Sequence, residues 1–437
     1  MTRLVQPTRI LIVGGGGREH ALAWKLAAEP GVNEVIVAPG SAAIGREPRV
    51  SLDPSVDPLD PGAVVGAARR HAVELVVIGP EAPLAAGVAD ALIEAGIPVF
   101  GPTAAAARIE SSKAFCREVA EAAGVPMARG RAFSRTDPSA GLAYAMGLAR
   151  DGRVVVKADG LAAGKGVTVC DSPDEAAVAI AGQPDTFIVE ERLVGHEASV
   201  MAICDGRHAR ALPIARDHKR LTDGDRGPNT GGMGAISPVA DLPDADAEAI
   251  VKRFHEPILA ELARRGTPFR GVLYAGLMLT TDGPLLLEFN ARFGDPETQA
   301  ILPRVATPLG PLLLAAARGT LGDGPGPATL PGATVAIVLA AADYPGRPLT
   351  GDAIVGIAAA EALGSLVFHA ATRDHAAAGE NGWLTAGGRV LSVVGRGPDL
   401  EAARAAAEAA ADRISWPGMQ RRHDIGGMVR EPAGAPA

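Results

Sequence analysis

The sequence predicts a multidomain α/β protein with a doubly wound parallel sheet at its N-terminal end and a small α+β domain at its C-terminal end. Its 437 residues exceed what one hydrophobic core usually holds, and about 150 residues per domain predicts about three domains. Over roughly the first hundred residues, short apolar strands alternate with helices, and each strand ends in a Gly or Pro loop. A linker at 328–332 separates a last group of strands. We expect domains at 1–108, 109–327 and 333–430.

The N-terminal elements follow from this alternation. A helix is expected over His20–Ala28 and a long one over Ala104–Ala123. Ligands of doubly wound sheets bind at the carboxyl ends of the strands, where the loops lie. The expected strands are Arg9–Val13, Glu34–Val37, Leu75–Ile78 and Pro98–Phe100.

Short strands dominate the middle and the end of the chain. Leu273–Thr280 and Pro284–Phe289 are expected to form a hairpin that turns at 281–283. Other expected strands are Val154–Ala158, Val167–Cys170, Phe187–Glu191, Val200–Ile203, Thr334–Ala340, Leu366–His369 and Arg389–Gly395. A final alanine-rich helix is expected over Asp399–Ile414, and residues 431–437 are expected to be disordered.

Composition excludes several classes of protein. A formal net charge of -8 argues against a general nucleic-acid binder. No apolar run is long enough for a membrane span, and no secretion signal precedes Leu11–Val13. The three cysteines, Cys116, Cys170 and Cys204, are too few and too widely spaced for a disulfide framework or a zinc site. We therefore expect a cytoplasmic protein.

Two glycine-rich segments could bind phosphate. Lysine is scarce, at six of 42 basic residues, yet the segment 157–166 begins with Lys157 and carries a second lysine, Lys165. Glycines let the backbone close over phosphates that lysines neutralise. The spacing is not that of a Walker A loop, and a solvated β-turn is the alternative. Gly14–Gly17 could hold an anion at a helix start or could be a tight packing turn, and Glu19 breaks the dinucleotide fingerprint there.

The segment 285–298 is the most informative. Strand alternation places Glu288, Asn290 and Arg292 on one face. A carboxylate and an amide oxygen suit magnesium shared with a triphosphate, and an arginine beside them can stabilise a transferring phosphoryl group. The alternative is a surface strand with a satisfied ion pair, which leaves the dense Arg-Phe-Gly-Asp-Pro-Glu run that follows unexplained.

Two further segments are polar. Residues 189–193 follow an apolar strand and could form a hinge that pairs with an adenine edge, with Glu197 on the ribose, although adjacent acids at a strand end are usually solvated. Residues 217–220 and 227–234 belong to a long glycine-rich loop, which is either functional or a disordered surface loop. His218 within it could be a general base or simply a solvated histidine.

In this order the segments resemble the ATP-grasp superfamily and, more narrowly, its phosphoribosylamine–glycine ligase family of purine biosynthesis. The resemblance covers almost the whole chain. The motifs that carry it are Gly-Gly-Arg-Glu-His-Ala (16–21), Gly-Pro-Glu-Ala-Pro-Leu (79–84), Phe-Gly-Pro-Thr (100–103), Lys-Ala-Asp-Gly-Leu-Ala-Ala-Gly-Lys-Gly (157–166), Asp-His-Lys-Arg (217–220), Gly-Pro-Asn-Thr-Gly-Gly-Met-Gly-Ala (227–235), Glu-Phe-Asn-Ala-Arg-Phe-Gly-Asp-Pro-Glu-Thr-Gln (288–299), Tyr-Pro-Gly (344–346), Gly-Gly-Arg-Val-Leu (387–391) and Asp-Ile-Gly (424–426).

The resemblance implies an N-terminal pre-ATP-grasp domain, an ATP-grasp core whose mobile lobe at about 125–194 closes over ATP, and a C-terminal domain of the hybrid-motif kind. It implies a cytoplasmic enzyme, expected to be a monomer, that joins glycine to 5-phosphoribosylamine, cleaving ATP to ADP and phosphate through glycyl phosphate. The implied cofactor ions are Mg²⁺ or Mn²⁺.

The same resemblance assigns roles to residues. Glu288 and Asn290 would hold the metal, and Arg292 would steady the transferring group. Asp217 and Lys219 would act on the substrates. The residues expected to bind ATP are Lys113, Lys157, Gly164, Lys165, Gly166, Glu190, Glu191, Leu193 and Glu197. Those expected to bind substrate are Gly16, Gly17, Asp295, Pro296, Glu297 and Thr298.

Three rival interpretations stay open at this point. Another ATP-grasp carboxylate–amine ligase or carboxylase, such as a formate-using transferase or a biotin carboxylase, is the nearest. A non-catalytic nucleotide sensor would leave the Glu288, Asn290 and Arg292 set without a purpose. A dinucleotide-dependent reductase is disfavoured by the broken fingerprint.

Overall fold

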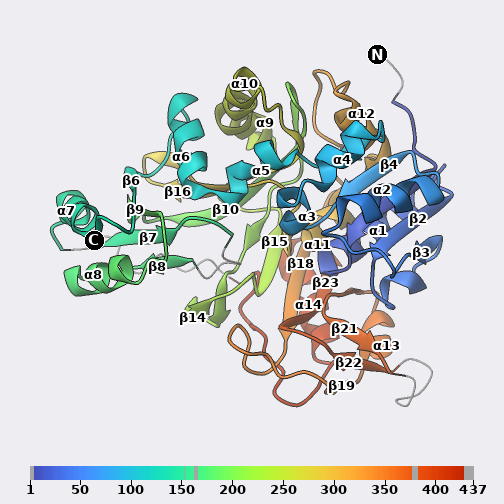
Figure 1. Cartoon of the computed structure of the whole chain (residues 1–437). Coiled ribbons are helices and arrows are strands. Elements are labelled where there is room, and N and C mark those ends of the chain that lie inside the picture. The colour runs from blue at the N-terminus through green and yellow to red at the C-terminus, as the bar shows by residue number, and fades with distance from the viewer. Residues whose placement is uncertain (1–3, 152, 162–165, 376–381, 428–437) are drawn as a thin grey trace.

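The computed structural model describes residues 4–151, 153–161, 166–375 and 382–427. The N-terminal part contains a parallel sheet in the order β3-β2-β1-β4-β5, which confirms the doubly wound sheet predicted from the sequence (Figure 1). Its strands are β1 (Arg9–Gly14), β2 (Glu34–Pro39), β3 (Val50–Leu52), β4 (Leu75–Ile78) and β5 (Val99–Phe100).

Helices accompany this sheet, because the apolar strands are buried on both faces. Sequence signals explain where they begin: Asp60 caps α2 by accepting hydrogen bonds from the Gly62 and Ala63 N–H groups, and Pro61 occupies the first turn. The helices are α1 (Gly17–Ala27), α2 (Pro61–Arg70), α3 (Glu81–Ala85), α4 (Val88–Glu94) and the short 3₁₀ turn η1 (Ile44–Arg46).

The single long helix expected over 104–123 is wrong. The structure has two helices, α5 (Ala104–Ser111) and α6 (Lys113–Ala122), which are separated at Ser112. Ser112 is extended, with φ −138° and ψ 111°, and its hydroxyl accepts a hydrogen bond from the Phe115 N–H. A serine inside a helix-forming stretch therefore acts as the cap of a new helix. This break places Lys113 at the first position of α6.

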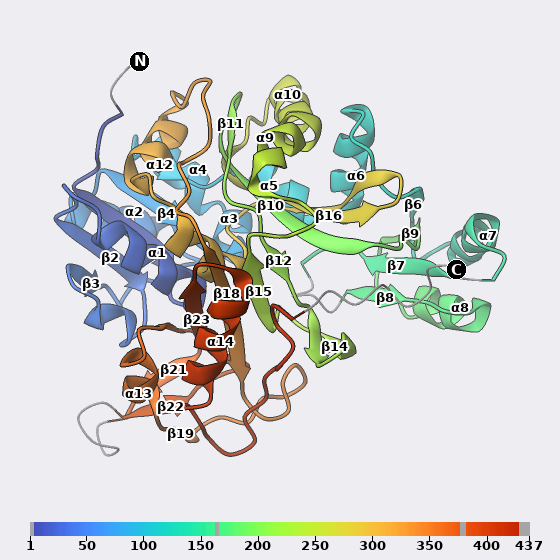
Figure 2. The same ribbon diagram turned by 180° about the vertical axis from the view of Figure 1, so that it is seen from behind.

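A separate lobe follows, within the range 125–194. An antiparallel sheet in the order β6-β9-β7-β8 carries two helices, and the lobe projects away from the N-terminal sheet in Figures 1 and 2. We call this lobe the flap. Its elements are β6 (Gly130–Phe133), α7 (Pro138–Leu148), β7 (Val154–Ala158), β8 (Val167–Val169), α8 (Pro173–Ala181) and β9 (Phe187–Glu191).

The central sheet, β11-β10-β16-β17, lies beside the flap. Strands β16 and β17 form the expected hairpin, and its register skips Leu287, which makes a bulge directly before Glu288. We call this sheet the floor. Its strands are β10 (His196–Asp205), β11 (Ala209–Ala211), β16 (Arg270–Thr280) and β17 (Gly283–Asn290). The accompanying helices are η2 (Asp244–Asp246), α9 (Ala247–Ile250), the π-helix η3 (Val251–His255), α10 (Glu256–Arg264), α11 (Glu297–Ile301), η4 (Leu302–Arg304) and α12 (Leu309–Arg318).

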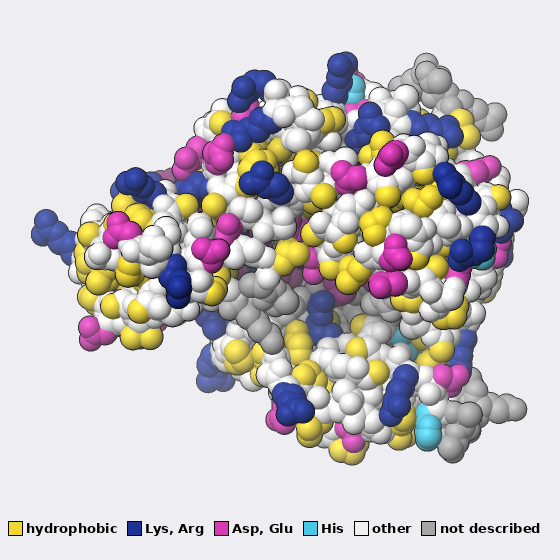
Figure 3. Space-filling view, viewed as in Figure 1, with side chains coloured by type: hydrophobic (Ala, Val, Ile, Leu, Met, Phe, Trp, Pro, Cys, Tyr) yellow, Lys and Arg dark blue, Asp and Glu magenta, His cyan; other side chains and the backbone are white. Residues whose placement is uncertain are grey.

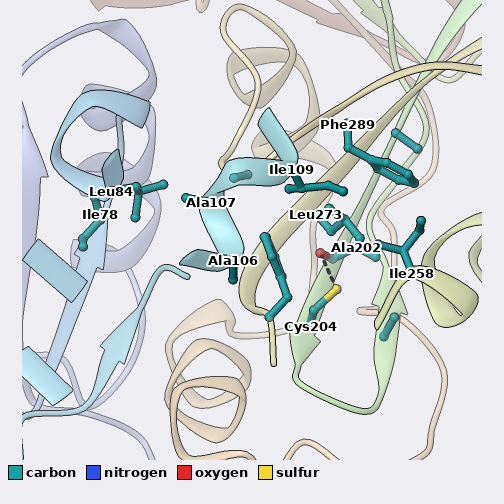
Figure 4. Packing of buried hydrophobic residues seen from close by; sticks show 14 of the residues in the cluster. Ile78, Leu84, Ala106, Ala107, Ile109, Ala202, Cys204, Ile258, Leu273 and Phe289 are labelled. Atoms are coloured by element: carbon teal, nitrogen blue, oxygen red, sulfur yellow. Dashed lines mark hydrogen bonds between the residues drawn. The ribbon is translucent and has the colours of Figure 1, made fainter. Parts of the chain in front are cut away.

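The floor and the N-terminal sheet share one apolar core. Ile78, Leu84, Ile109, Leu273 and Phe289 belong to one continuous cluster, in which α5 lies between the N-terminal sheet and the floor (Figure 4). The flap has a cluster of its own, formed by Ala145, Val154, Val156, Cys170, Ala176, Ile180, Phe187 and Val189. The floor is therefore continuous with the N-terminal part, and the flap packs as a separate body.

The loop at 217–235 is more ordered than the sequence predicts. It contains a two-stranded hairpin, β13 (Arg220–Thr222) with β14 (Arg226–Asn229). On either side of the hairpin, β12 (Arg216–Asp217) and β15 (Gly234–Ser237) join the C-terminal sheet β12-β15-β18-β23-β20. The pairing of β15 with β18 links segments about a hundred residues apart, which local sequence patterns do not report.

The rest of the C-terminal part is a mixed arrangement of sheet and helix. Helix α14 (Leu400–Ala411) packs on β18 and β23, and Asp399 caps it by accepting from the Ala402 N–H. The other elements are β18 (Ala333–Ala340), β19 (Ala353–Ile354), α13 (Ile357–Glu361), β20 (Leu366–His369), β21 (Thr372–Asp374), β22 (Trp383–Thr385) and β23 (Arg389–Gly397). Residues 431–437, expected to be disordered, lie outside the described residues.

Within the described ranges, every helix is too short or too polar to cross a lipid bilayer. The boundaries of the three predicted domains, 108, 327 and 333, stay predictions.

Candidate active site

A large cleft lies where the flap, the floor and the C-terminal part meet. Its volume is about 1810 Å³, and Figure 3 shows the surface hollowed there, with acidic side chains inside. The residues predicted from the sequence that line it are Lys113, Lys157, Gly166, Glu190, Glu191, Leu193, Glu197, Asp217, Lys219, Glu288, Asn290, Arg292, Asp295 and Glu297. The fold thus gathers into one space residues that lie up to about 180 positions apart in the sequence.

Strand β17 presents Glu288 and Asn290 to this cleft. The residue between them, Phe289, is buried in the core, as strand alternation requires. Burial alone would raise the pKa of Glu288, but the ammonium groups of Lys219, Lys157 and Lys113 hold it below its ordinary value. The Glu288 carboxylate is therefore ionised at neutral pH and is available to a cation.

Arg292 lies just beyond the end of β17 and is held by two acids of the N-terminal part. Its Nη2 is 3.1 Å from Glu110 Oε1, and its Nε is 3.5 Å from Glu81 Oε2. Glu110 also accepts a hydrogen bond of 2.8 Å from the Ala291 N–H. Burial raises the pKa of Glu110 in spite of the neighbouring Arg292 guanidinium. Arg292 is fixed at the junction of the floor with the N-terminal sheet.

Lys219 lies among carboxylates. Its Nζ is 2.6 Å from Glu197 Oε2 and 4.0 Å from Glu288 Oε1. Burial would lower the pKa of Lys219, but Asp217, Glu197 and Glu288 raise it well above its ordinary value, so the ammonium stays charged. At Asp217 burial outweighs the attraction of the Lys219 ammonium and raises the pKa of that carboxyl to about 7.

The flap contributes Lys157. Its Nζ lies 2.6 Å from Glu190 Oε2 and donates a hydrogen bond of 3.0 Å to the carbonyl oxygen of Leu287, the bulged residue of β17. Arg117 binds the other oxygen of Glu190 at 2.8 Å. Burial opposes ionisation of Glu190, but Lys157 and Arg117 outweigh it and hold its pKa below the ordinary value. The side chain of Glu190 is thus fully occupied by Lys157 and Arg117.

The other ATP-binding candidates are also placed. Lys113 Nζ donates to the Gly160 carbonyl oxygen at 2.9 Å, at the start of the glycine-rich segment. Glu191 pairs with Arg129 at 2.7 Å. Gly164 and Lys165 lie outside the described residues.

The substrate candidates divide into two groups. Asp295 lies in the cleft beside Arg389, with 3.4 Å between Oδ2 and Nη2, and Glu297 accepts a hydrogen bond of 2.6 Å from the Tyr274 hydroxyl. Thr298 is buried, and its hydroxyl donates to the Gly294 carbonyl oxygen at 2.6 Å. The described lining includes neither Thr298 nor Pro296.

Gly16 is the N-cap of α1 and Gly17 its first residue, so the helix begins three residues before the start expected at His20. The Gly16 N–H already donates to Glu19 Oε2 at 2.7 Å, so a substrate phosphate would have to compete with that carboxylate. A Cβ added at Gly17 would lie 2.9 Å from Gln299 Nε2, so close packing against Gln299 is also a reason for a glycine at this position. The described lining contains Arg18 from this segment but neither glycine.

Sequence reasoning missed several residues that hold the site together. Glu81 lies in the Gly-Pro-Glu-Ala-Pro-Leu segment and Arg389 in the Gly-Gly-Arg-Val-Leu segment, so these motifs could have pointed to them. Glu110 and Arg117 lie on helices α5 and α6, where acids and bases are common and no pattern marks them. Only the three-dimensional contacts reveal their role.

Comparisons with known proteins agree over nearly the whole chain. Residues 8–110, 111–298 and 334–428 match the family models of the N domain, the ATP-grasp (A) domain and the C domain of phosphoribosylglycinamide synthetase. The phosphoribosylamine–glycine ligase of Streptomyces coelicolor is 50% identical over 95% of this chain and 98% of that protein.

Solved structures show the same architecture. The crystal structure of phosphoribosylamine–glycine ligase from Thermotoga maritima matches with a TM-score of 0.76 and 32% identity, over 95% of this chain and 99% of that one. The biotin carboxylase domain of the Hydrogenobacter thermophilus 2-oxoglutarate carboxylase, at 16% identity and a TM-score of 0.70, covers 95% of this chain and 92% of its own and shares the fold. The chain belongs to the phosphoribosylamine–glycine ligase family of ATP-grasp proteins.

Proposed function

We propose that this protein joins glycine to 5-phosphoribosylamine and cleaves ATP to ADP and phosphate, giving glycinamide ribonucleotide for purine biosynthesis. The observation that carries the proposal is family membership over 95% of the chain, together with one cleft that contains the acidic floor and the lysine-bearing flap. The nearest rival, an ATP-grasp carboxylase, is supported by likeness of fold alone.

A divalent ion, Mg²⁺ or Mn²⁺, fits the donors on β17. Glu288 offers an ionised carboxylate and Asn290 an amide oxygen, both hard ligands. Among the described residues no three His, Cys, Asp or Glu side chains form a metal group, so triphosphate oxygens would have to complete the coordination. When bound, the ion would offset negative charge on the phosphates.

The chemistry is proposed to have two steps. An oxygen of the glycine carboxylate attacks the γ-phosphorus and forms a P–O bond while the bond to the ADP oxygen breaks, which gives glycyl phosphate. The amine of phosphoribosylamine then attacks the glycyl carbonyl carbon, inorganic phosphate leaves, and the amine loses one proton. Positioning and neutralisation of charge dominate the first step.

The residues of this chain would do the following. Lys113 and Lys157 bind ATP phosphates, and Arg292, held rigidly by Glu110 and Glu81, faces the transferring group. Lys157 forms an ion pair with Glu190, which fixes its position, and its ammonium group would reach the phosphates from there. The flap, with Gly164, Lys165 and Gly166, would exclude water that could hydrolyse the acyl phosphate.

The nucleoside would lie along the flap. Backbone groups from Glu190 to Leu193 would form hydrogen bonds with adenine. Glu197, whose carboxylate also pairs with Lys219, would accept hydrogen bonds from the ribose hydroxyls. Asp217, with a pKa near 7, could accept a proton from an amine, and Lys219 could bind a carboxylate. Asp295–Thr298, with Gly16 and Gly17, remain the candidates for the substrate ribose phosphate and amine. We also expect a monomer in the cytoplasm.

The test is ADP formation by the purified protein with glycine and phosphoribosylamine, omitting one component at a time. We expect ADP only when both are present with a divalent ion. Turnover that depends on formate, or on bicarbonate and biotin, and ignores glycine would overturn the proposal. Mass spectrometry of the product distinguishes coupled synthesis from simple ATP hydrolysis.

A further inference from the structure

Residues 422–424, near the C-terminal end, form hydrogen bonds and ion pairs with the hairpin β13–β14. The side chain of Arg422 is only 1% exposed and donates to the carbonyl oxygen of Arg220 at 3.2 Å. The same Nη1 lies 2.6 Å from Asp225 Oδ1, in the turn of the hairpin. Arg422 therefore holds both the base and the tip of a hairpin that is about 200 residues away in sequence.

Asp424 binds both Arg422 and the hairpin. It accepts two hydrogen bonds from Arg422, 2.7 Å from Nε and 2.8 Å from Nη2, in the fork geometry that favours arginine over lysine. Its Oδ2 also accepts from the Gly224 N–H at 2.8 Å, and the His423 N–H donates to Asp223 Oδ1 at 2.8 Å. We call residues 422–424 the clasp.

The base of the hairpin is joined to the C-terminal sheet through β12 and β15. Beyond that base, the two hairpin strands pair among the described residues with each other alone, and their side chains are exposed or half-buried. An isolated two-stranded hairpin is marginally stable in water, so polar contacts with the clasp help to fix where its turn lies. A buried guanidinium that lost its carboxylate partners would be strongly unfavourable, so Arg422 favours the one hairpin position in which Asp225 and Asp424 both reach it.

The hairpin is directly joined to a residue of the candidate site. Lys219 immediately precedes β13, and its carbonyl oxygen accepts from both the N–H and the hydroxyl of Thr230, at 2.8 Å each, just after β14. The hairpin and the clasp also line the same cleft. A shift of the hairpin would therefore move Lys219 relative to Glu197 and Glu288.

We propose that Arg422 and Asp424 are positioning residues, which act through the β13–β14 hairpin to fix Lys219 and the substrate side of the cleft. This rests on the proposed function, because it assigns the hairpin to the binding of glycine and phosphoribosylamine. The C-terminal part thus takes part in substrate recognition although Lys219 belongs to the ATP-grasp region.

The variants Arg422→Gln and Asp424→Asn test the proposal, with Arg421→Gln as the matched control. Arg421 is adjacent but pairs with Glu408 and Asp412, on and just after α14, so its loss perturbs the C-terminal part without touching the hairpin. We expect the clasp variants to raise KM for glycine or phosphoribosylamine about tenfold and KM for ATP by a smaller factor, because Lys219 also pairs with Glu197. Arg422→Lys should recover only part of this loss, because a point charge cannot reproduce the fork.

Hydrogen exchange provides a second readout that needs no turnover. Amides of residues 220–230 should exchange faster in the two clasp variants and not in Arg421→Gln, while amides of β16 and β17 stay as in the wild type. Unchanged exchange at 220–230, or an equal rise of KM in Arg421→Gln, would overturn the proposal. A wild-type protein without glycine-dependent turnover would refute the proposed function instead, and the exchange comparison would still test the clasp.

Discussion

The two walls of the cleft are built differently. The floor shares its apolar core with the N-terminal sheet, and Glu110 ties the end of β17 to helix α5. The flap has its own core and is attached through polar contacts: Lys157 donates to the Leu287 carbonyl oxygen of the floor, and Asp159 accepts from Ser112 and Ala114 at the junction of α5 and α6. Apolar packing fixes the geometry of one wall, whereas hydrogen bonds that can exchange with ligand hold the other.

The largest expected effect tests the floor. Glu288→Gln removes a charge but keeps the size of the side chain, so we expect the rate of ADP formation to fall about 10²- to 10³-fold while the melting temperature stays within a few degrees. Steady-state kinetics and thermal unfolding measure the two quantities. Glu401→Gln, an exposed change on α14, is the control. A Glu288→Gln enzyme with wild-type turnover would refute the metal assignment.

The second prediction tests whether the floor is as rigid as its core implies. His255 is fully buried, its Nε2 lies 3.2 Å from the Val200 carbonyl oxygen and 3.1 Å from that of Leu273, and burial lowers its pKa to about 4. The unfolded state, with a pKa near 6.5, binds the proton first. Stability is therefore present above pH 6.5 and lost as the pH falls towards 4, by at most about 3 kcal/mol from this group.

Denaturant unfolding between pH 4 and 8 measures this loss. The non-titrating variant His255→Gln should show a shallower pH dependence below 6.5 and a parallel one above 7. His218 and His369, whose pKa values burial lowers to about 4 and about 3, keep some dependence in both proteins. Identical slopes in the two proteins would contradict the buried neutral state of His255.

The third prediction tests the flap. Lys157→Ala removes one charge-assisted contact to phosphate, at about 1.5–3 kcal/mol, so KM for ATP should rise about ten- to a hundredfold. KM for glycine should change little, because the flap is proposed to meet the nucleotide. Lys252→Ala, an exposed lysine on η3, is the control. If the change fell on glycine and not on ATP, the assignment of the two walls would have to be reversed.

The smallest effect concerns how the flap is attached. Asp159 accepts from the Ser112 hydroxyl at 3.1 Å and from the Ala114 N–H at 3.2 Å, so Asp159→Asn should weaken the attachment by about 1 kcal/mol. Amides of β7 and β9 should exchange several-fold faster, and those of β16 should not change. The exposed Asp174→Asn in the same lobe is the control. Equal acceleration in the flap and the floor would show that the two walls are not independent.

The sequence predicted the regular parts of this structure well. The N-terminal strands, the β16–β17 hairpin and the assembly of Glu288, Asn290 and Lys157 in one cleft follow from period, turn residues and motif. These features depend on neighbours in the chain or on a recognised pattern.

Other features could not be predicted, because they depend on distant contacts. A serine such as Ser112 can lie inside a helix or can cap one, and only its three-dimensional surroundings decide which of the two it does. Glu110 and Arg422 are ordinary charged residues whose partners lie about 180 and 200 positions away. The ordering of 217–235 likewise depends on strands of the C-terminal sheet.

The shared sheet has a consequence for how the protein is made. On the ribosome β15 emerges about a hundred residues before its neighbour β18, so its edge must wait without a partner while the intervening chain is synthesised. Fragments that end before residue 333 would carry that open edge permanently and would tend to aggregate. The C-terminal side of the cleft can therefore form only after β18 has been synthesised.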